Sequence, residues 1–207
     1  MIGRLQSGYP GLRPVLFWSP YEAAAWTIIG HRIRIAQAAS IKQRMAEQRG
    51  EKVDVHGERL YAFPGPHRLL SMRGFPGLFG RKIMQLHEVA RAALDGRLNA
   101  HRLRSRPPDE ALGGLKSLPG VGDFSAELIL VRGAGDPDYF PRKERRLQRA
   151  MADAYGFAEI PSIEKLTEIA ERWRPYRSWV SVLFRTELEG PNPRDFENSR
   201  QPSVELT

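Results

Sequence analysis

The 207-residue sequence contains no cysteine. Disulfide bonds, thiolate zinc sites and cysteine-held iron–sulfur clusters are therefore excluded. The five histidines are scattered and show no metal-ligand spacing, so we expect no metal site and no required cofactor. No run of about 18 apolar residues occurs, which predicts no membrane span. The N-terminus lacks a signal-peptide pattern, and we expect a cytoplasmic protein.

Acidic residues are in the minority. Lys and Arg number 32 against 24 Asp and Glu, which gives a formal net charge of +8 and a pI of about 10.1. Such an excess favours a polyanionic partner, above all nucleic acid. A generally basic surface with no such partner is the alternative.

The sequence pattern is helical almost throughout, which predicts an all-α fold. Ser19 and Pro20 are a typical N-cap and first helical residue, and Asp95-Gly96 ends a later amphipathic helix. Residues 50–66 are polar and irregular, with room for short strands only. The tail 190–207 is rich in Pro, Asn, Arg and Ser and is expected to be flexible. Further helices are predicted at 33–48, 67–72, 83–94, 142–155, 162–172 and 176–189.

Residues 115–129 are the most informative stretch and are typical of a helix, a tight turn and a second helix. The turn, Leu118-Pro-Gly-Val-Gly122, has two glycines two apart, which allows its backbone to lie close to another molecule. The second helix begins there, so its free N–H groups and positive dipole end face the same way. This pattern predicts an anion site, and in so basic a chain the expected anion is a nucleic-acid phosphate.

This turn, followed by Ser125-Ala126, resembles the helix–hairpin–helix of DNA-repair glycosylases. The resemblance continues through Val131-Arg-Gly-Ala-Gly-Asp-Pro-Asp-Tyr-Phe-Pro141. Ala170-Glu-Arg-Trp-Arg-Pro-Tyr-Arg-Ser178 is similar to the C-terminal signature of the DNA-3-methyladenine glycosylase II branch. A hairpin alone occurs in many DNA-binding proteins, whereas these three motifs in this order are much more specific.

The resemblance implies two helical subdomains with a DNA-binding cleft between them. One would comprise residues 20–137 with the hairpin at 115–129, and the other residues 1–19 together with 138–189. The hairpin would hold a DNA phosphate, in relatives often with a monovalent cation nearby. The hairpin residues expected to contact DNA are Leu118, Gly120, Val121, Gly122 and Ser125.

The activity implied by the resemblance is base removal. A damaged base is rotated out of the duplex and its N-glycosidic bond is hydrolysed. The chain is thus expected to be a monofunctional DNA glycosylase that removes alkylated purines in base excision repair. It would act as a monomer on double-stranded DNA, in association with the nucleoid.

The catalytic position of the family follows the Phe-Pro segment and falls on Glu144, where the family has an aspartate. A carboxylate there stabilises the positive charge that develops on the sugar. The extra methylene can move the carboxylate by one C–C bond, roughly 1.5 Å, and a misplacement of about 1 Å can cost on the order of 100-fold in rate. Alternatively, Glu144 is the first-turn acid of a basic helix, paired with Arg145, Arg149 or the helix dipole.

The expected base pocket also departs from the branch. An aromatic residue often lies opposite the carboxylate, and its position here is Arg185. An arginine would repel a cationic methylpurine but can stack on a neutral base. Phe124 is available as a pocket aromatic, and the further candidates are Trp26, Trp173, Tyr176 and Trp179. Ordinary packing is the alternative interpretation of these further candidates.

Two basic segments are candidates for DNA contact. His31 and Arg32 occupy the helix junction that, in the branch, carries the residues filling the gap left by the flipped base. Arg142 and Lys143 begin the densest basic cluster, residues 142–149, which is expected to contact phosphates. Solvated side chains are the alternative for both segments, and plain phosphate contacts are a further alternative for the junction.

Three other functions stay open at this point. The first is a catalytically silent relative that binds distorted or damaged duplex, which the departures at Glu144 and Arg185 favour. The second is a protein-interaction module of a larger repair assembly. The third is a helical enzyme with a small phosphate-bearing substrate, whose binding should depend little on DNA length.

Phe124 generates a first prediction. Bifunctional relatives resemble this hairpin but have a lysine at this position, which forms a Schiff base with the sugar. Because phenylalanine cannot do so, borohydride reduction in the presence of abasic DNA should trap no covalent adduct. A trapped protein–DNA adduct would contradict the monofunctional assignment.

Overall fold

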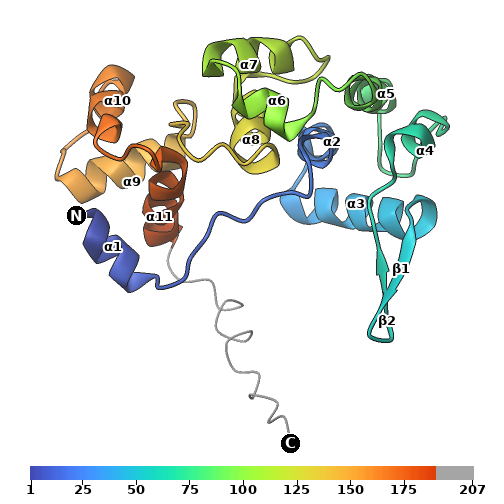
Figure 1. The fold of residues 1–207 in the computed structure, drawn as a ribbon, viewed down its shortest axis with the longest axis horizontal. Coiled ribbons are helices and arrows are strands. Elements are labelled where there is room, and N and C mark those ends of the chain that lie inside the picture. Colours follow the sequence, from blue (N-terminus) through green and yellow to red (C-terminus); the bar gives the residue numbers. More distant parts are fainter. Residues whose placement is uncertain (190–207) are drawn as a thin grey trace, which may run out of the picture. The chain divides into compact units, whose positions relative to one another are not determined.

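The computed structural model describes residues 1–189, and the predicted flexible tail, residues 190–207, lies outside the described residues. The chain divides into two units. The continuous unit is Val15–Tyr139, and the discontinuous unit joins Met1–Pro14 to residues 140–189 of the described chain. Figure 1 labels the elements of each unit.

The continuous unit consists of helices and one strand pair. In chain order its elements are α2 (Pro20–Gly30), α3 (Ile35–Arg49), β1 (Lys52–Val55), β2 (Glu58–Tyr61), α4 (Pro66–Leu70), α5 (Lys82–Leu94), α6 (Ala100–Arg104), α7 (Pro108–Lys116), α8 (Asp123–Leu128) and the π-helical turn η1 (Ile129–Gly133). The discontinuous unit contains α1 (Ile2–Gly8), α9 (Arg145–Tyr155), α10 (Ile163–Glu171) and α11 (Arg177–Glu189).

The helix α2 lies at the centre of the continuous unit, in contact with α3, α5, α8 and η1 (Figure 1). It begins as predicted, with the Ser19 Oγ accepting the Glu22 N–H at 3.2 Å. Its residues 23–25 are alanines with no exposed surface, and Ile28 and Ile29 are also fully buried. Small side chains let the neighbouring helices approach α2 closely.

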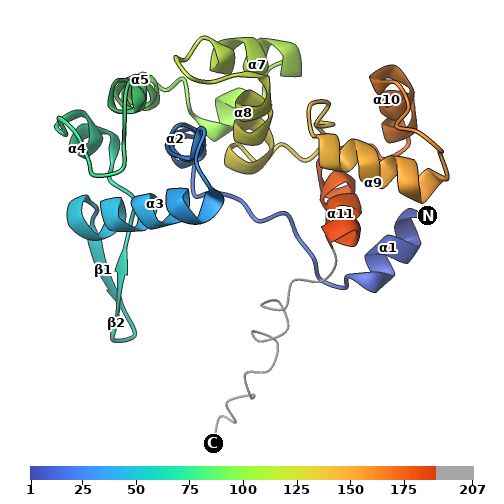
Figure 2. The ribbon, with the colours of Figure 1, turned by 180° about the vertical axis from the view of Figure 1, so that it is seen from behind.

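The strands β1 and β2 form a hairpin around the turn His56-Gly57, with Val55 opposite Glu58. Both turn residues have positive φ, 49° and 84°, as a two-residue type I′ turn requires. All strand residues are exposed, so the hairpin adds nothing to the core. Both views show it extending away from α3 (Figure 2).

Aromatic stacking organises the core of the discontinuous unit. The Trp173 ring stacks on Phe184 with centroids 5.1 Å apart, and Phe140 meets Trp173 edge-on at 6.0 Å. From α9, Leu147 and Met151 are fully buried, one helical turn apart. The helix α9 ends at Gly156, whose φ of 73° is the left-handed conformation expected at a helix C-terminus.

The prediction of a helical fold is confirmed, with β1 and β2 as short strands in the segment expected to be irregular. The short helices α1 and α6 were not predicted. Each buries one side chain, Leu5 and Leu103 respectively, so neither carries a repeating apolar pattern. Within residues 1–189, no helix is long and apolar enough to cross a membrane.

The packing of η1 on α2 predicts an effect on stability. A Cβ on Gly133 would lie 2.7 Å from the Ala23 Cβ and 2.9 Å from the Pro20 Cα. Gly133→Ala should therefore lower the free energy of unfolding by about 1–3 kcal/mol through overpacking. The measurement is chemical denaturation.

Gly113→Ala in α7 is the matched control, because no atom lies within 4 Å of its added Cβ. Higher helix propensity should raise the free energy of unfolding there by about 0.5–1 kcal/mol. Equal effects of the two substitutions would contradict the close approach of η1 to α2.

Candidate functional site

The turn between α7 and α8 is shaped by Gly120. Its φ is +88°, and a Cβ there would lie 2.6 Å from the Gln85 Nε2 and 2.8 Å from the Ile28 Cδ1. Leu118 and Val121 are buried, and the Val121 N–H donates to the Leu118 carbonyl at 3.0 Å. The Leu118 and Val121 side chains therefore pack into the core, and Pro119 is exposed but has no polar side-chain atom. The polar groups that the turn presents to a ligand are therefore those of its backbone.

Gly122 differs from Gly120. Its φ of −93° and ψ of −174° are open to any residue, and no atom lies within 4 Å of the Cβ that it lacks. It is the N-cap of α8, with no side-chain cap. The first N–H groups of α8 are thus directed out of the helix end together with the positive end of its dipole. Asp123 follows, and its carboxylate pairs with the Lys116 Nζ at 3.1 Å.

The junction after α2 is a tight exposed turn. His31 and Arg32 are both exposed, and Arg32 has a φ of +56°. That left-handed conformation costs a residue with a Cβ roughly 1–2 kcal/mol. Such outliers are retained where the surroundings enforce them, and they are frequent at functional sites.

Glu144 is the N-cap residue of α9. Its Oε1 accepts the Arg146 N–H at 3.3 Å, and its Oε2 lies 3.4 Å from the Arg185 NH1. The Glu144 side chain is 17% exposed and that of Arg185 33%. The structure thus brings the predicted carboxylate and the predicted pocket arginine together, through the packing of α11 on α9. The cation in contact with Glu144 is Arg185, rather than Arg145 or Arg149.

The basic cluster beside Glu144 faces solvent. The carbonyl of Arg142 accepts the Gln148 Nε2–H at 2.7 Å, which fixes the backbone before α9. The side chains exposed in this cluster are those of Arg142, Lys143, Arg145, Arg146 and Arg149. They are accessible to a polyanion, as phosphate contact would require.

The aromatic candidates for the base pocket differ in exposure. Phe124, in the first turn of α8, is 52% exposed, and Tyr176 is 54% exposed with its ring edge-on to Trp179. Trp26 is half-buried on α2, with its ring centroid 6.4 Å from that of Phe17. Ser125 is half-buried in α8.

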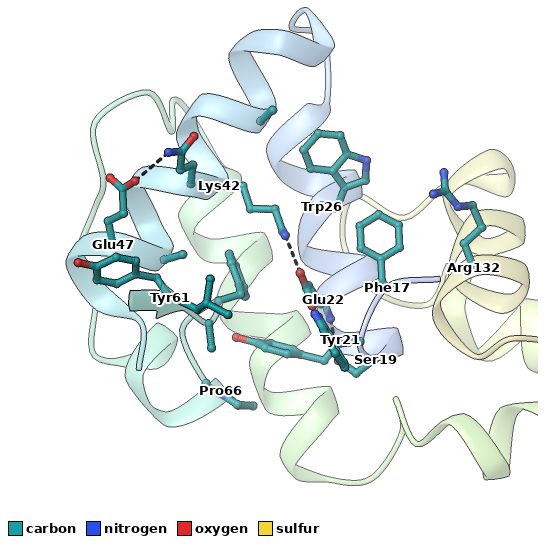
Figure 3. Close-up of a pocket in the computed structure, with 18 of the residues that line it drawn as sticks. Phe17, Ser19, Tyr21, Glu22, Trp26, Lys42, Glu47, Tyr61, Pro66 and Arg132 are labelled. Atoms are coloured by element: carbon teal, nitrogen blue, oxygen red, sulfur yellow. Dashed lines mark hydrogen bonds and ion pairs between the residues drawn. The ribbon is translucent and has the colours of Figure 1, made fainter. Parts of the chain in front are cut away.

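Trp26 lines a groove of about 870 Å³ in the continuous unit, which the sequence did not predict (Figure 3). Phe17 lies beside Trp26 toward one end, and Tyr61 lies toward the other. Between them the Glu22 Oε1 and the Lys42 Nζ pair at 2.5 Å. Phe124 is not among the residues that line this groove. The only sequence signal was the aromatic run around the start of α2, which is indistinguishable from ordinary core packing.

Tyr21 contributes to the wall of this groove. Its hydroxyl donates to the Pro64 carbonyl at 2.7 Å. Burial, reinforced by the charge of the neighbouring Glu22, raises the pKa of Tyr21 above its usual range. The Tyr21 hydroxyl therefore stays a neutral hydrogen-bond donor, and it fixes the chain that leads from β2 to α4. Among residues 1–189, no group of three or more His, Asp or Glu side chains could hold a metal ion.

Comparison with known proteins gives a consistent result. No protein-family profile matches the sequence. The chain is 29% identical over 201 residues to DNA-3-methyladenine glycosylase 2 of Escherichia coli K12, and the aligned region covers 93% of this chain and 66% of that protein. It is 23% identical over 178 residues to a DNA-3-methyladenine glycosylase of Bacillus subtilis 168, and the aligned region covers 84% of this chain and 59% of that protein.

A solved structure is also similar over most of the chain. The 3-methyladenine DNA-glycosylase of Archaeoglobus fulgidus matches with a TM-score of 0.73 and 26% identity, over 90% of this chain and 65% of that one. The chain therefore spans less than two thirds of the length of each of these three proteins.

The helical arrangement around the Gly120 turn is the fold of the helix–hairpin–helix DNA glycosylases. Together with the sequence similarity, it shows that the chain belongs to that superfamily, in its DNA-3-methyladenine glycosylase II branch.

The two glycines of the turn generate a prediction. Gly120→Ala adds a Cβ at a left-handed position against Gln85 and Ile28, so it should cost roughly 1–2 kcal/mol of backbone strain and about 1–3 kcal/mol of overpacking. Gly122→Ala, in extended backbone and open space, should change stability by less than about 0.5 kcal/mol. Urea denaturation measures both. A similar loss at the two positions would show that the turn is not fixed through Gly120.

Proposed function

We propose that the protein is a monofunctional DNA glycosylase that hydrolyses the N-glycosidic bond of damaged, alkylated purines in double-stranded DNA during base excision repair. The observation that carries the proposal is the hairpin turn. Gly120 packs its turn onto the core while Gly122 leaves the start of α8 open. This occurs in a chain whose relatives are named as glycosylases of this kind.

In this proposal the hairpin binds one DNA phosphate. The backbone N–H groups that follow Gly122 donate to the phosphate oxygens, with the dipole of α8 adding favourable charge. Leu118 and Val121 act through packing, because their side chains are buried. The exposed basic side chains of the cluster at 142–149 supply further phosphate contacts. Each phosphate that they neutralise adds about 0.9 to the slope of log binding constant against log salt concentration, the salt slope.

A monovalent cation beside the hairpin belongs to the proposal as well. Main-chain carbonyls of the turn would hold it. The Leu118 carbonyl accepts the Val121 N–H at 3.0 Å, and a carbonyl oxygen has a second lone pair for such a ligand. When bound, the cation would add positive charge next to the phosphate and take no part in bond cleavage.

His31 and Arg32 are proposed to enter the gap that the flipped base leaves. Their exposed turn supports the assignment, because a residue that enters a base stack must project from the protein surface. The guanidinium of Arg32 is planar and can stack between bases.

Glu144 is the proposed catalytic residue. Its carboxylate would stabilise the positive charge that develops on the sugar and orient the attacking water. Phe124 and Tyr176 have exposed rings suited to stacking on a base, whereas Trp26 packs against Phe17 and is less accessible. The cationic head of Arg185 favours a neutral damaged base over a cationic one.

The ion pair between Glu144 and Arg185 favours a second candidate function. A carboxylate already paired with a guanidinium contributes less field at the sugar than an unpaired one. In the second candidate the protein binds distorted or damaged duplex through the hairpin and does not cleave the glycosidic bond. Glu144 then serves as the N-cap of α9, held by Arg185.

Glu144→Gln tests the catalytic assignment. Glutamine keeps an Oε1 that can accept the Arg146 N–H, so α9 stays capped, but the charge is lost. Single-turnover release of 3-methyladenine, 7-methylguanine or hypoxanthine from duplex DNA should fall by on the order of 100-fold or more. Duplex binding should change little.

Glu168→Gln is the control, since it removes an exposed carboxylate from α10 that pairs with Lys165. It should release bases at the wild-type rate. Equal rates for Glu144→Gln and wild type would remove Glu144 from the mechanism. Binding without release by the wild type would favour the second candidate.

A further inference from the structure

Two side chains of α5 reach the two turns that are proposed to contact DNA. Lys82 and Gln85 are three residues apart and therefore lie on the same face of the helix. Lys82 extends to the end of α2, just before His31 and Arg32. Gln85 extends to Gly120 of the hairpin turn.

Lys82 stabilises the C-terminus of α2. Its Nζ donates to the Ile29 carbonyl at 2.8 Å. The carbonyls on either side of Ile29 accept backbone N–H groups, from His31 to Ile28 at 3.3 Å and from Ile33 to Gly30 at 3.4 Å. Three consecutive carbonyls at the end of α2 are thus satisfied, the middle one by a side chain of another helix.

Without a partner, the position of the Lys82 ammonium would be energetically unfavourable. It is the first residue of α5, where a cation opposes the helix dipole. It is also half-buried, and burial lowers the pKa of its ammonium below the usual range. The favourable partner is the negative end of α2, which the ammonium contacts through the Ile29 carbonyl. This contact offsets the cost, and it lies where the chain leaves α2 and enters the turn with the left-handed Arg32.

The Gln85 side chain packs against the hairpin turn at Gly120. A Cβ on Gly120 would lie 2.6 Å from the Gln85 Nε2 and 2.8 Å from the Ile28 Cδ1, so both side chains lie directly against this glycine. Ile28 is fully buried and precedes Ile29, whose carbonyl Lys82 contacts. The contacts form a closed series from α5 to the end of α2, from α2 to the hairpin turn, and back to α5.

The geometry points to Lys82 and Gln85 as positioning residues, which fix the turn of His31 and Arg32 relative to the hairpin turn at Gly120. They would set the distance between the residue that enters the base-stack gap and the phosphate that the hairpin holds. This inference rests on the proposed function. Its physical basis is that a DNA duplex presents gap and phosphate at a fixed separation, so pre-organised turns bind with less loss of conformational entropy.

The test compares binding to two duplexes, one intact and one with a stable abasic analogue that leaves a gap. Lys82→Met removes the ammonium with little change of length, Lys82→Arg restores a cationic donor, and Gln85→Ala removes the packing surface under Gly120. Arg91→Met is the matched control, since it removes one exposed cation of the same helix, one that pairs with Glu88. Hydrogen exchange at residues 31–33 is followed in the free proteins.

Lys82→Met should lower the preference for the gapped duplex by about tenfold, the effect of losing a hydrogen bond to a charged donor. Gln85→Ala should lower it in the same direction. Lys82→Arg should recover most of the preference, and Arg91→Met should keep it. Exchange at residues 31–33 should rise in Lys82→Met and return toward wild type in Lys82→Arg.

Two outcomes would overturn the inference. One is an unchanged preference in a folded Lys82→Met protein. The other is equal weakening on both duplexes with a salt slope smaller by about 0.9, which would make Lys82 a phosphate contact. A wild type without any preference for the gapped duplex contradicts the proposed function instead. In that case hydrogen exchange alone tests the inference. Protection of residues 31–33 that is retained in Lys82→Met contradicts the inference, and protection that is lost supports it.

Discussion

The contact of Gly120 with Ile28 and Gln85 is the constraint on which the proposed DNA-binding part of the continuous unit depends. Because Gly120 has no side chain, the hairpin turn approaches α2 and α5 until its Cα lies against their side chains. Leu118 and Val121 then fill the core on either side. Pro119 is exposed but has no polar side-chain atom, so the turn has only backbone polar groups to offer to a ligand. Backbone N–H groups at a helix start suit a phosphate.

The discontinuous unit contains the proposed catalytic residue, whose side chain makes two contacts. Glu144 caps α9 through the Arg146 N–H and pairs with Arg185 of α11. Both contacts hold the carboxylate in one orientation, which a catalytic group requires. The same arginine neutralises part of the charge that catalysis would use. Arg185 thus both orients the Glu144 carboxylate and neutralises part of its charge. Which of these two effects is larger decides whether the glutamate can act as the family's aspartate does.

Local signals in the sequence predicted much of the fold. Ser19 and Pro20 marked the start of α2, and Gly120 and Gly122 marked the hairpin. Contacts between distant residues were beyond the sequence, because no local pattern encodes them. The donation from Lys82 to Ile29 spans 53 positions, and the lysine itself looks like any surface cation. The groove at Trp26 likewise depends on how α2, α3 and β2 come together.

The central claim is that this chain removes a damaged base and leaves the DNA backbone intact. The most direct measurement is mass spectrometry of the products after the full chain is incubated with duplex containing 3-methyladenine, 7-methylguanine or hypoxanthine. The account predicts a free base and an abasic strand that breaks only on treatment with alkali. Unmodified DNA recovered from a duplex that the protein demonstrably binds would contradict it.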